Sequence, residues 1–275
     1  MGFKPNQELQ KFLAEDLGSG DITSNLLERK QITAQIITRQ HAVVSGGVFA
    51  KQIFSLKKCK TRIIKKDGMR VKPNQVILEL KGDASAILSC ERTALNLLSR
   101  MCGITTKTDQ LCRLLKKINS KTKLFATRKT APGLRYFDKI AVEIGGGNKH
   151  RMTLDDMIMF KDNHFAVENS IFKLIKKAKK TGKKIEGEVE SEKDAILVAT
   201  LGADIIMLDN FTPKKIKNTI RSLEDLKLKK NIKIEASGRI NEKNILQYAK
   251  TGVDMISMGE LTNSVQGIDL SLEIS

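Results

Sequence analysis

The chain is poor in aromatic side chains and has no tryptophan. Phe, Trp and Tyr together make up 4% of its 275 residues. Proteins that bind single-stranded nucleic acid stack its bases on such rings, so this composition argues against that activity. The formal net charge is nevertheless +18 and the pI about 9.7. Charge therefore leaves two classes open, a basic nucleic-acid-binding protein and an enzyme for polyanionic substrates.

Paired cysteine motifs and long apolar runs are absent as well. The four cysteines, Cys59, Cys90, Cys102 and Cys112, include no CxxC pair, and no histidine follows at zinc-finger spacing. We therefore expect reduced thiols and a cytoplasmic protein. No apolar stretch approaches the length of a membrane span, and the mixed, charged N-terminal sequence lacks the apolar core of a signal peptide. We expect no membrane partner.

The first hundred residues show a mixed pattern. Helical spacing covers Asn6–Leu17 and Ala84–Cys102. Between Gln31 and Leu80 the pattern is one of short β-like runs separated by turn residues, and one of these runs is His41–Ala50. This combination predicts a small α+β domain over residues 1–103.

After Gly103, apolar segments alternate with helical ones. The expected strands are Leu124–Arg128, Met157–Lys161, Ile185–Glu190, Ile205–Asp209, Ile232–Ser237 and Met255–Gly259. The expected helices are Ile171–Lys180, Glu192–Leu201, Lys214–Leu223 and Glu242–Lys250. Such alternation is typical of a parallel sheet or barrel. It predicts an α/β fold, an incomplete (β/α) barrel over residues 104–267.

Polar residues end most of these expected strands. They are Arg128, Lys161, Glu190, Asp209 and the pair Ser237-Gly238. Because the C-terminal ends of barrel strands converge on one mouth, the sequence predicts one pocket, cationic beside the first two strands and acidic beside the next two. Each residue also has a purely structural explanation, since Asp209 could cap a helix and Glu190 could pair with Lys193.

The stretch Thr127–His164 is dense in groups that bind anions. Six cationic or imidazole side chains accompany the triple glycine Gly145–Gly147; they are Arg128, Lys129, Arg135, His150, Arg151 and Lys161. A solvated helical face would instead repeat its charges on one stripe with acidic partners. The pattern here is typical of a site built from loops at strand ends.

Three motifs in this stretch, TRKTAPGLR, GGGNKHR and FKDNH, resemble those of the quinolinate phosphoribosyltransferase family. Later segments extend the resemblance: Glu188–Glu190, Leu208–Phe211, Glu235–Gly238 and Met258-Gly259. It implies transfer of phosphoribosyl from phosphoribosyl pyrophosphate to quinolinate with decarboxylation, which yields nicotinate mononucleotide. Mg²⁺ is the cofactor that it implies.

The resemblance also implies roles for individual residues. Arginine forks suit carboxylates, so the expected quinolinate clamp is Arg92, Arg128 and Arg151 with His150 and Lys161. The catalytic candidates are Lys129, as a phosphoribosyl or diphosphate contact, and Glu190 and Asp209, as Mg²⁺ or ribose ligands. The expected cradle for the 5′-phosphate is Ser237, Gly238 and Gly259, at a following helix N-terminus.

Arg92 is the residue from which we expect a homodimer. In the family this arginine reaches the substrate of the neighbouring subunit, so the resemblance implies a homodimer with Arg92 donated across the interface; a higher oligomer stays open. The resemblance further implies that residues 268–275 return to the first domain, and the alternation in Asp269–Glu273 is compatible with a terminal strand.

Some positions depart from the family pattern. Lys149 stands where an asparagine is usual, Arg239 where a second glycine is common, Asn263 where a histidine is frequent, and Gly187 interrupts a β-branched run. Three alternatives therefore stay open: a diverged relative resembling the molybdenum-cluster accessory protein ModD, a nicotinate-using phosphoribosyltransferase, and a basic nucleic-acid-binding protein.

Overall fold

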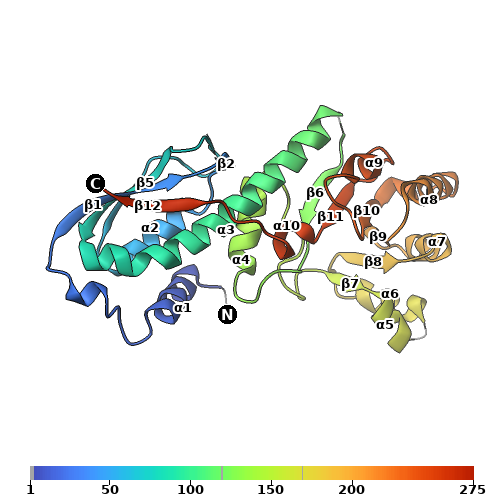
Figure 1. The fold of residues 1–275 in the computed structure, drawn as a ribbon. Helices are drawn as coiled ribbons and strands as arrows, with labels where there is room; N and C mark the ends of the chain where they lie inside the picture. The colour runs from blue at the N-terminus through green and yellow to red at the C-terminus, as the bar shows by residue number, and fades with distance from the viewer. Residues whose placement is uncertain (1–2, 119, 169) are drawn as a thin grey trace. The chain divides into compact units, whose positions relative to one another are not determined.

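The computed structural model describes residues 3–118, 120–168 and 170–275. The chain divides into two compact units. The first holds the chain up to Asp109 together with Thr130–Gly146 and Leu261–Ser275, and the second holds Gln110–Lys129 and Gly147–Glu260. Each unit contains a sheet of its own (Figure 1).

The first unit contains a four-stranded antiparallel sheet with the order β12-β1-β5-β3. Its strands are β1 (Gln31–Thr38), β3 (Lys60–Ile63), β5 (Val76–Asp83) and β12 (Leu270–Ile274), while β2 (Ala42–Val43) and β4 (Arg70–Val71) form a separate pair. Ala34, Ile36 and Thr38 of β1 are buried and alternate with more exposed residues, so the sheet buries one face. The last strand, β12, pairs with β1.

One expected strand of this unit is largely a helix. The helices are α1 (Pro5–Leu17), α2 (Gly47–Leu56) and α4 (Arg135–Ile144), with a 3₁₀ turn η1 (Ser24–Leu26). A strand over His41–Ala50 is therefore wrong beyond Val43. Gly46 adopts φ 91°, in the left-handed region, and the Asp67 carboxylate accepts the N–H groups of Gly46 and Gly47 at 3.2 Å each. A distant carboxylate thus caps α2, which local patterning could not indicate.

Helix α3 (Ala84–Lys117) is longer than expected. The sequence predicted a helix over Ala84–Cys102, whereas the helix continues through Gly103 to Lys117. A Cβ at position 103 would lie 2.1 Å from the Gln266 carbonyl oxygen. Gly103 therefore permits a close approach of the C-terminal segment rather than ending the helix.

The second unit is built on a six-stranded parallel sheet with the order β6-β11-β10-β9-β8-β7. The strands are β6 (Lys123–Ala126), β7 (Ile158–Phe160), β8 (Ile185–Val189), β9 (Ile205–Asp209), β10 (Lys233–Ser237) and β11 (Met255–Met258). All six match the predicted segments to within two residues at either end. The α/β prediction, with a smaller N-terminal domain, is confirmed.

Helices follow most strands of this sheet, as the alternation predicted (Figure 1). They are α5 (Asp162–Val167), α6 (Ile171–Lys179), α7 (Glu192–Thr200), α8 (Pro213–Asp225), α9 (Ile245–Ala249) and α10 (Glu260–Asn263), with a 3₁₀ turn η2 (Lys229–Asn231). Ile206, Leu208 and Ile234 are fully buried within the sheet. Gly187 lies where a Cβ would approach Val198 to 2.6 Å, which explains the glycine in a β-branched run.

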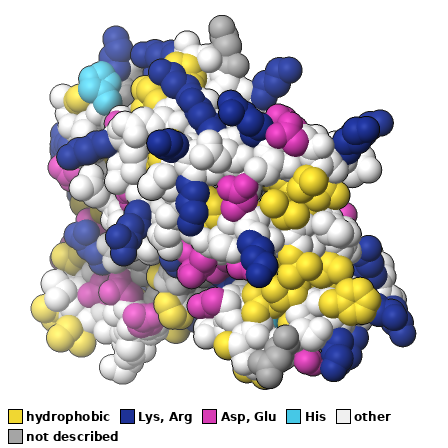
Figure 2. Space-filling view, turned by 90° about the vertical axis from the view of Figure 1, so that its right-hand side faces the viewer, with side chains coloured by type: hydrophobic (Ala, Val, Ile, Leu, Met, Phe, Trp, Pro, Cys, Tyr) yellow, Lys and Arg dark blue, Asp and Glu magenta, His cyan; other side chains and the backbone are white. Residues whose placement is uncertain are grey.

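Surface charge is dispersed on one face of the molecule. On the face drawn in Figure 2, Lys and Arg side chains stand apart, with acidic and apolar side chains between them. Dispersed lysines contribute mainly to solubility. In the part of the chain that the structure describes, no helix is both long enough and apolar enough to cross a membrane.

Candidate functional site

The second unit gathers the predicted polar residues at one edge of its sheet. Arg128 and Lys161 follow β6 and β7, and Glu190 follows β8. Asp209 and Ser237 are the last residues of β9 and β10, which pair with each other in register. Because the six strands are parallel, these C-terminal ends share one edge of the sheet, and Arg128 and Lys161 follow its two outermost strands.

Two arginines form the cationic part of this edge. Arg151 is buried, at 9% exposure, and its Nη2 donates to Met159 Sδ at 3.1 Å. Burial, and after it the charge of Arg128, lowers the pKa of Arg151, while Glu186, Glu188 and Asp156 act in the opposite direction. Arg128 has a buried Nε with no hydrogen-bond partner among the described residues. Two guanidiniums that repel each other, one of them with an unused donor, are suited to an anion with several oxygen acceptors.

Lys161 lies beside an acidic strand. Its ammonium group pairs with the Glu188 carboxylate on the neighbouring strand β8. The Lys161 N–H also donates to Nδ1 of His164 at 3.1 Å, which fixes the start of α5. The pair is only partly exposed, so it holds the lysine in a defined position at the edge.

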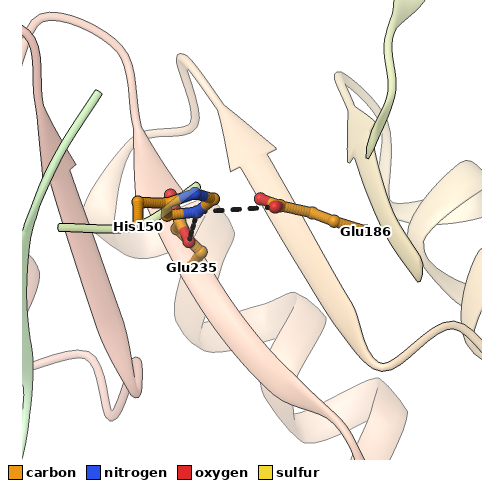
Figure 3. Close-up of side chains that lie close together, drawn as sticks. All are labelled: His150, Glu186 and Glu235. Atoms are coloured by element: carbon orange, nitrogen blue, oxygen red, sulfur yellow. Dashed lines mark hydrogen bonds and ion pairs between the residues drawn. The ribbon is translucent and has the colours of Figure 1, made fainter. Parts of the chain in front are cut away.

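His150 lies on two fully buried carboxyl groups, Glu186 of β8 and Glu235 of β10 (Figure 3). Its Nε2 is 3.2 Å from Glu235 Oε2 and 3.4 Å from Glu186 Oε2. Burial first, and then the charge of Glu235, raises the pKa of Glu186 to about 9. The backbone of His150 has φ 53°, an unfavourable value for a side chain of this kind, and such strain is common at functional sites. By ligand type, the three side chains could hold a metal ion, because their nearest ligand atoms all lie within 4.8 Å.

The loop before His150 is anchored to β6. Asn148 N donates to Leu124 O at 2.8 Å, and Ala126 N donates to Asn148 O at 2.9 Å, as in a parallel bridge. The Phe125 ring meets the His150 ring edge to face, with centroids 5.8 Å apart. The position of His150 is thus fixed by the parallel bridge that the preceding residues of the glycine-rich motif form with β6.

The acidic candidates are accessible. Glu190 is exposed and Asp209 is half-buried, and the Asp209 carboxylate accepts a hydrogen bond from Asn210 Nδ2 at 2.6 Å. They stand at the ends of adjacent strands and offer oxygen atoms, the ligand type that Mg²⁺ prefers. These residues therefore fit a hard cation shared with a substrate phosphate.

The Ser237-Gly238 turn is tightly packed. Gly238 has φ 90°, and a Cβ there would lie 2.3 Å from Asn210 Oδ1. Arg239 follows with φ 52°, in the left-handed region, which explains why glycine suits this position. The helix that follows this turn, α9, begins at Ile245 rather than at the predicted Glu242, and Gly259 is followed at once by the short α10.

The remaining two candidates, Lys129 and Arg92, are both exposed. Lys129 is exposed, and its N–H donates to Thr127 Oγ1 at 3.1 Å. Arg92 is exposed on α3, in the first unit.

The sequence analysis gave no role to Glu186, Glu188 or Glu235. A signal was present in the run Glu186–Glu190, where glutamate occupies alternate positions. Because side chains of a strand alternate between faces, this spacing places Glu186 and Glu188 on one face of β8, with Glu190 directly after the strand.

The known proteins that resemble this chain in sequence and those that resemble it in structure carry the same family and enzyme names. Models of the quinolinate phosphoribosyl transferase N-terminal and C-terminal domains match residues 21–102 and 104–273. A relative from Methanothermobacter thermautotrophicus, named a probable nicotinate-nucleotide pyrophosphorylase (carboxylating), is 42% identical over 274 residues, which cover 97% of each chain. Solved nicotinate-nucleotide pyrophosphorylases from Francisella tularensis and Ehrlichia chaffeensis have TM-scores of 0.91 and 0.93 and identities of 37% and 34%. The matches cover 99% and 100% of this chain and 98% and 100% of theirs.

Proposed function

This chain belongs to the quinolinate phosphoribosyltransferase family, and from that membership we infer how its residues share the family's reaction. The enzyme transfers phosphoribosyl from phosphoribosyl pyrophosphate to quinolinate and releases carbon dioxide and diphosphate, which gives nicotinate mononucleotide for NAD biosynthesis. The family match favours this reaction over the three alternatives that the sequence left open.

Arg128, Arg151 and Lys161 clamp the two carboxylates of quinolinate, and His150, whose ring nitrogens both face protein groups, supports the clamp from beneath. The observation that carries this assignment is the buried guanidinium of Arg151 beside an Arg128 Nε that has no partner among the described residues. Burial of a dianion without such partners would be prohibitive. The clamp thereby orients the pyridine nitrogen toward the ribose.

Glu190 and Asp209 hold Mg²⁺, directly or through water, and Lys129 contacts the diphosphate or the phosphoribosyl group. When bound, the cation would neutralise negative charge on the departing diphosphate. Ser237, Gly238 and Gly259 bind the 5′-phosphate, and the Arg239 side chain, next to Gly238 in the chain, is exposed. This division keeps cationic groups on quinolinate and accessible carboxylates on the sugar and metal.

Bond formation begins as the pyridine nitrogen attacks ribose C1 while diphosphate departs through an oxocarbenium-like transition state. Positioning and fixed charges supply most of the acceleration. The resulting pyridinium stabilises the carbanion that remains when the carboxylate next to nitrogen leaves as carbon dioxide. None of these bond changes requires a general base.

Arg92 completes the clamp from the neighbouring subunit of a homodimer. Its exposed position on α3 leaves the guanidinium accessible to a partner. We place the enzyme in the cytoplasm, where its four cysteine thiols would stay reduced.

The purified protein is expected to convert quinolinate to nicotinate mononucleotide only when both phosphoribosyl pyrophosphate and Mg²⁺ are present. Chelation of the metal is expected to lower the rate by about 10²-fold or more, because the diphosphate would then depart with its charge uncompensated. Chromatography of the nucleotide product measures this, and readdition of Mg²⁺ is the control. Undiminished turnover in excess chelator would contradict the roles of Glu190 and Asp209.

A further inference from the structure

Two carboxyl groups lie inside the second unit without a role in the reaction as described. Glu186 and Glu235 are fully buried, and both point at the His150 ring (Figure 3). Among the described residues, neither oxygen of Glu186 and only one oxygen of Glu235 has a hydrogen-bond partner. Buried carboxylates normally have all their oxygens satisfied, so the charge of this pair has to be reduced by a proton or balanced by a cation.

Charge balance favours one proton. Around Glu186 lie two cations, Arg151 and Lys161, and two further carboxyl groups, Glu188 and Glu235. Lys161 is already paired with Glu188. Two like charges in one buried site cannot both persist at neutral pH, and a single shared proton leaves the pair with one negative charge.

The histidine ring argues against a metal ion. The backbone N–H of Arg151 donates to His150 Nδ1 at 2.9 Å. Nδ1 therefore accepts with its lone pair and carries no proton. The ring proton of the neutral imidazole therefore lies on Nε2, which faces Glu235 Oε2 at 3.2 Å. A metal at this place would need the Nε2 lone pair that the proton occupies.

We propose that Glu186 and Glu235 are positioning residues, which together carry one proton and one negative charge beneath His150 and thereby hold its ring as the neutral Nε2–H form. The role rests on the proposed function, because His150 supports the adjoining Arg151 of the quinolinate clamp. Loss of the shared proton would place a second negative charge under a site that must accept a dianion. The pair thus keeps the floor of the clamp compatible with its substrate.

Stability against pH tests the shared proton without any substrate. The folded chain retains a proton on Glu186 that the unfolded chain releases near the ordinary pKa of 4.5. This contribution to stability is fully present below that value and is lost as pH rises toward about 9. Glu186→Gln mimics the protonated carboxyl group at every pH. As the pH is raised from 5.5 to 8.5, the melting temperature of Glu186→Gln relative to that of wild type is therefore expected to rise by about 4 °C or more.

Glu224→Gln, at an exposed position of α8, is the matched control, and its difference from wild type is expected to stay constant with pH. A constant difference for Glu186→Gln as well would overturn the proposal. So would zinc that survives dialysis against a chelator in wild type and is lost in Glu186→Gln, since a cation would then hold the three side chains.

Kinetics test the positioning role separately. At pH 7, Glu186→Gln is expected to keep kcat and the KM for quinolinate within about threefold of wild type, whereas Glu186→Leu, which can neither share a proton nor donate, is expected to raise KM about tenfold with little change in kcat. Above pH 9, KM is expected to rise for wild type and not for Glu186→Gln. Equal KM values for the Leu and Gln variants at pH 7 would refute the positioning role. If wild type fails to turn over quinolinate, the proposed function fails, and the melting experiment still decides the shared proton.

Discussion

Replacement of Arg151 by alanine is expected to lower kcat/KM for quinolinate about 10³-fold, because a desolvated carboxylate that loses its guanidinium partner costs about 2–5 kcal/mol. Arg151 is buried and is flanked by a second guanidinium, so no water could replace its fork without reorganisation. Arg151→Lys keeps the charge and loses the planar fork, and we expect about a 10²-fold loss. Steady-state kinetics with quinolinate as the varied substrate measure both.

Arg128→Ala is expected to behave like Arg151→Ala, and Arg221→Ala, at an exposed position of α8, serves as the control with unchanged kinetics. Melting curves for each variant separate loss of the clamp from loss of the fold. Near-wild-type turnover of quinolinate in both Arg128→Ala and Arg151→Ala would refute the clamp.

Mixing two inactive variants is expected to restore activity if Arg92 acts across a subunit interface. Arg92→Ala and Lys161→Ala should each fall below about 1% of wild type, because each removes a cation from the dianion's site. In a mixed dimer, one of the two sites then receives an intact Arg92 and an intact Lys161. Random subunit exchange of equal amounts predicts about one quarter of wild-type activity, since half the dimers are mixed and half their sites are complete.

Native mass spectrometry of the same mixture shows whether mixed dimers have formed. Mixed dimers without recovered activity would show that Arg92 does not act on the partner's site. Arg113→Ala mixed with Lys161→Ala is a control for subunit exchange, and its activity should be that of the intact subunits in the mixture.

The second unit was the more predictable part of the molecule. Its strands are nearly continuous apolar runs between polar helices, which is how buried parallel strands read in a sequence. The same regularity identified Arg128, Lys161 and Asp209 as candidate site residues, because a polar residue at the end of an apolar run is easily recognised. The sequence alone therefore predicted which residues lie at the C-terminal edge of the sheet.

The errors come from interactions between residues far apart in the chain. Helix α2 begins where the Asp67 carboxylate caps Gly46 and Gly47, some twenty residues upstream of it. Helix α3 passes through Gly103 because the segment at Gln266 packs against it. Glu186 escaped notice because its importance depends on its burial and on the nearby Glu235, which lies on β10, two strands away from β8 in the sheet.

The most direct test of the central claim is a comparison of quinolinate with nicotinate as phosphoribosyl acceptor for the purified enzyme, with carbon dioxide and nicotinate mononucleotide measured together. A clamp built for two carboxylates predicts product from quinolinate alone, with one carbon dioxide released for each nucleotide formed. Turnover of nicotinate at a comparable rate, or nucleotide formed without carbon dioxide, would contradict it.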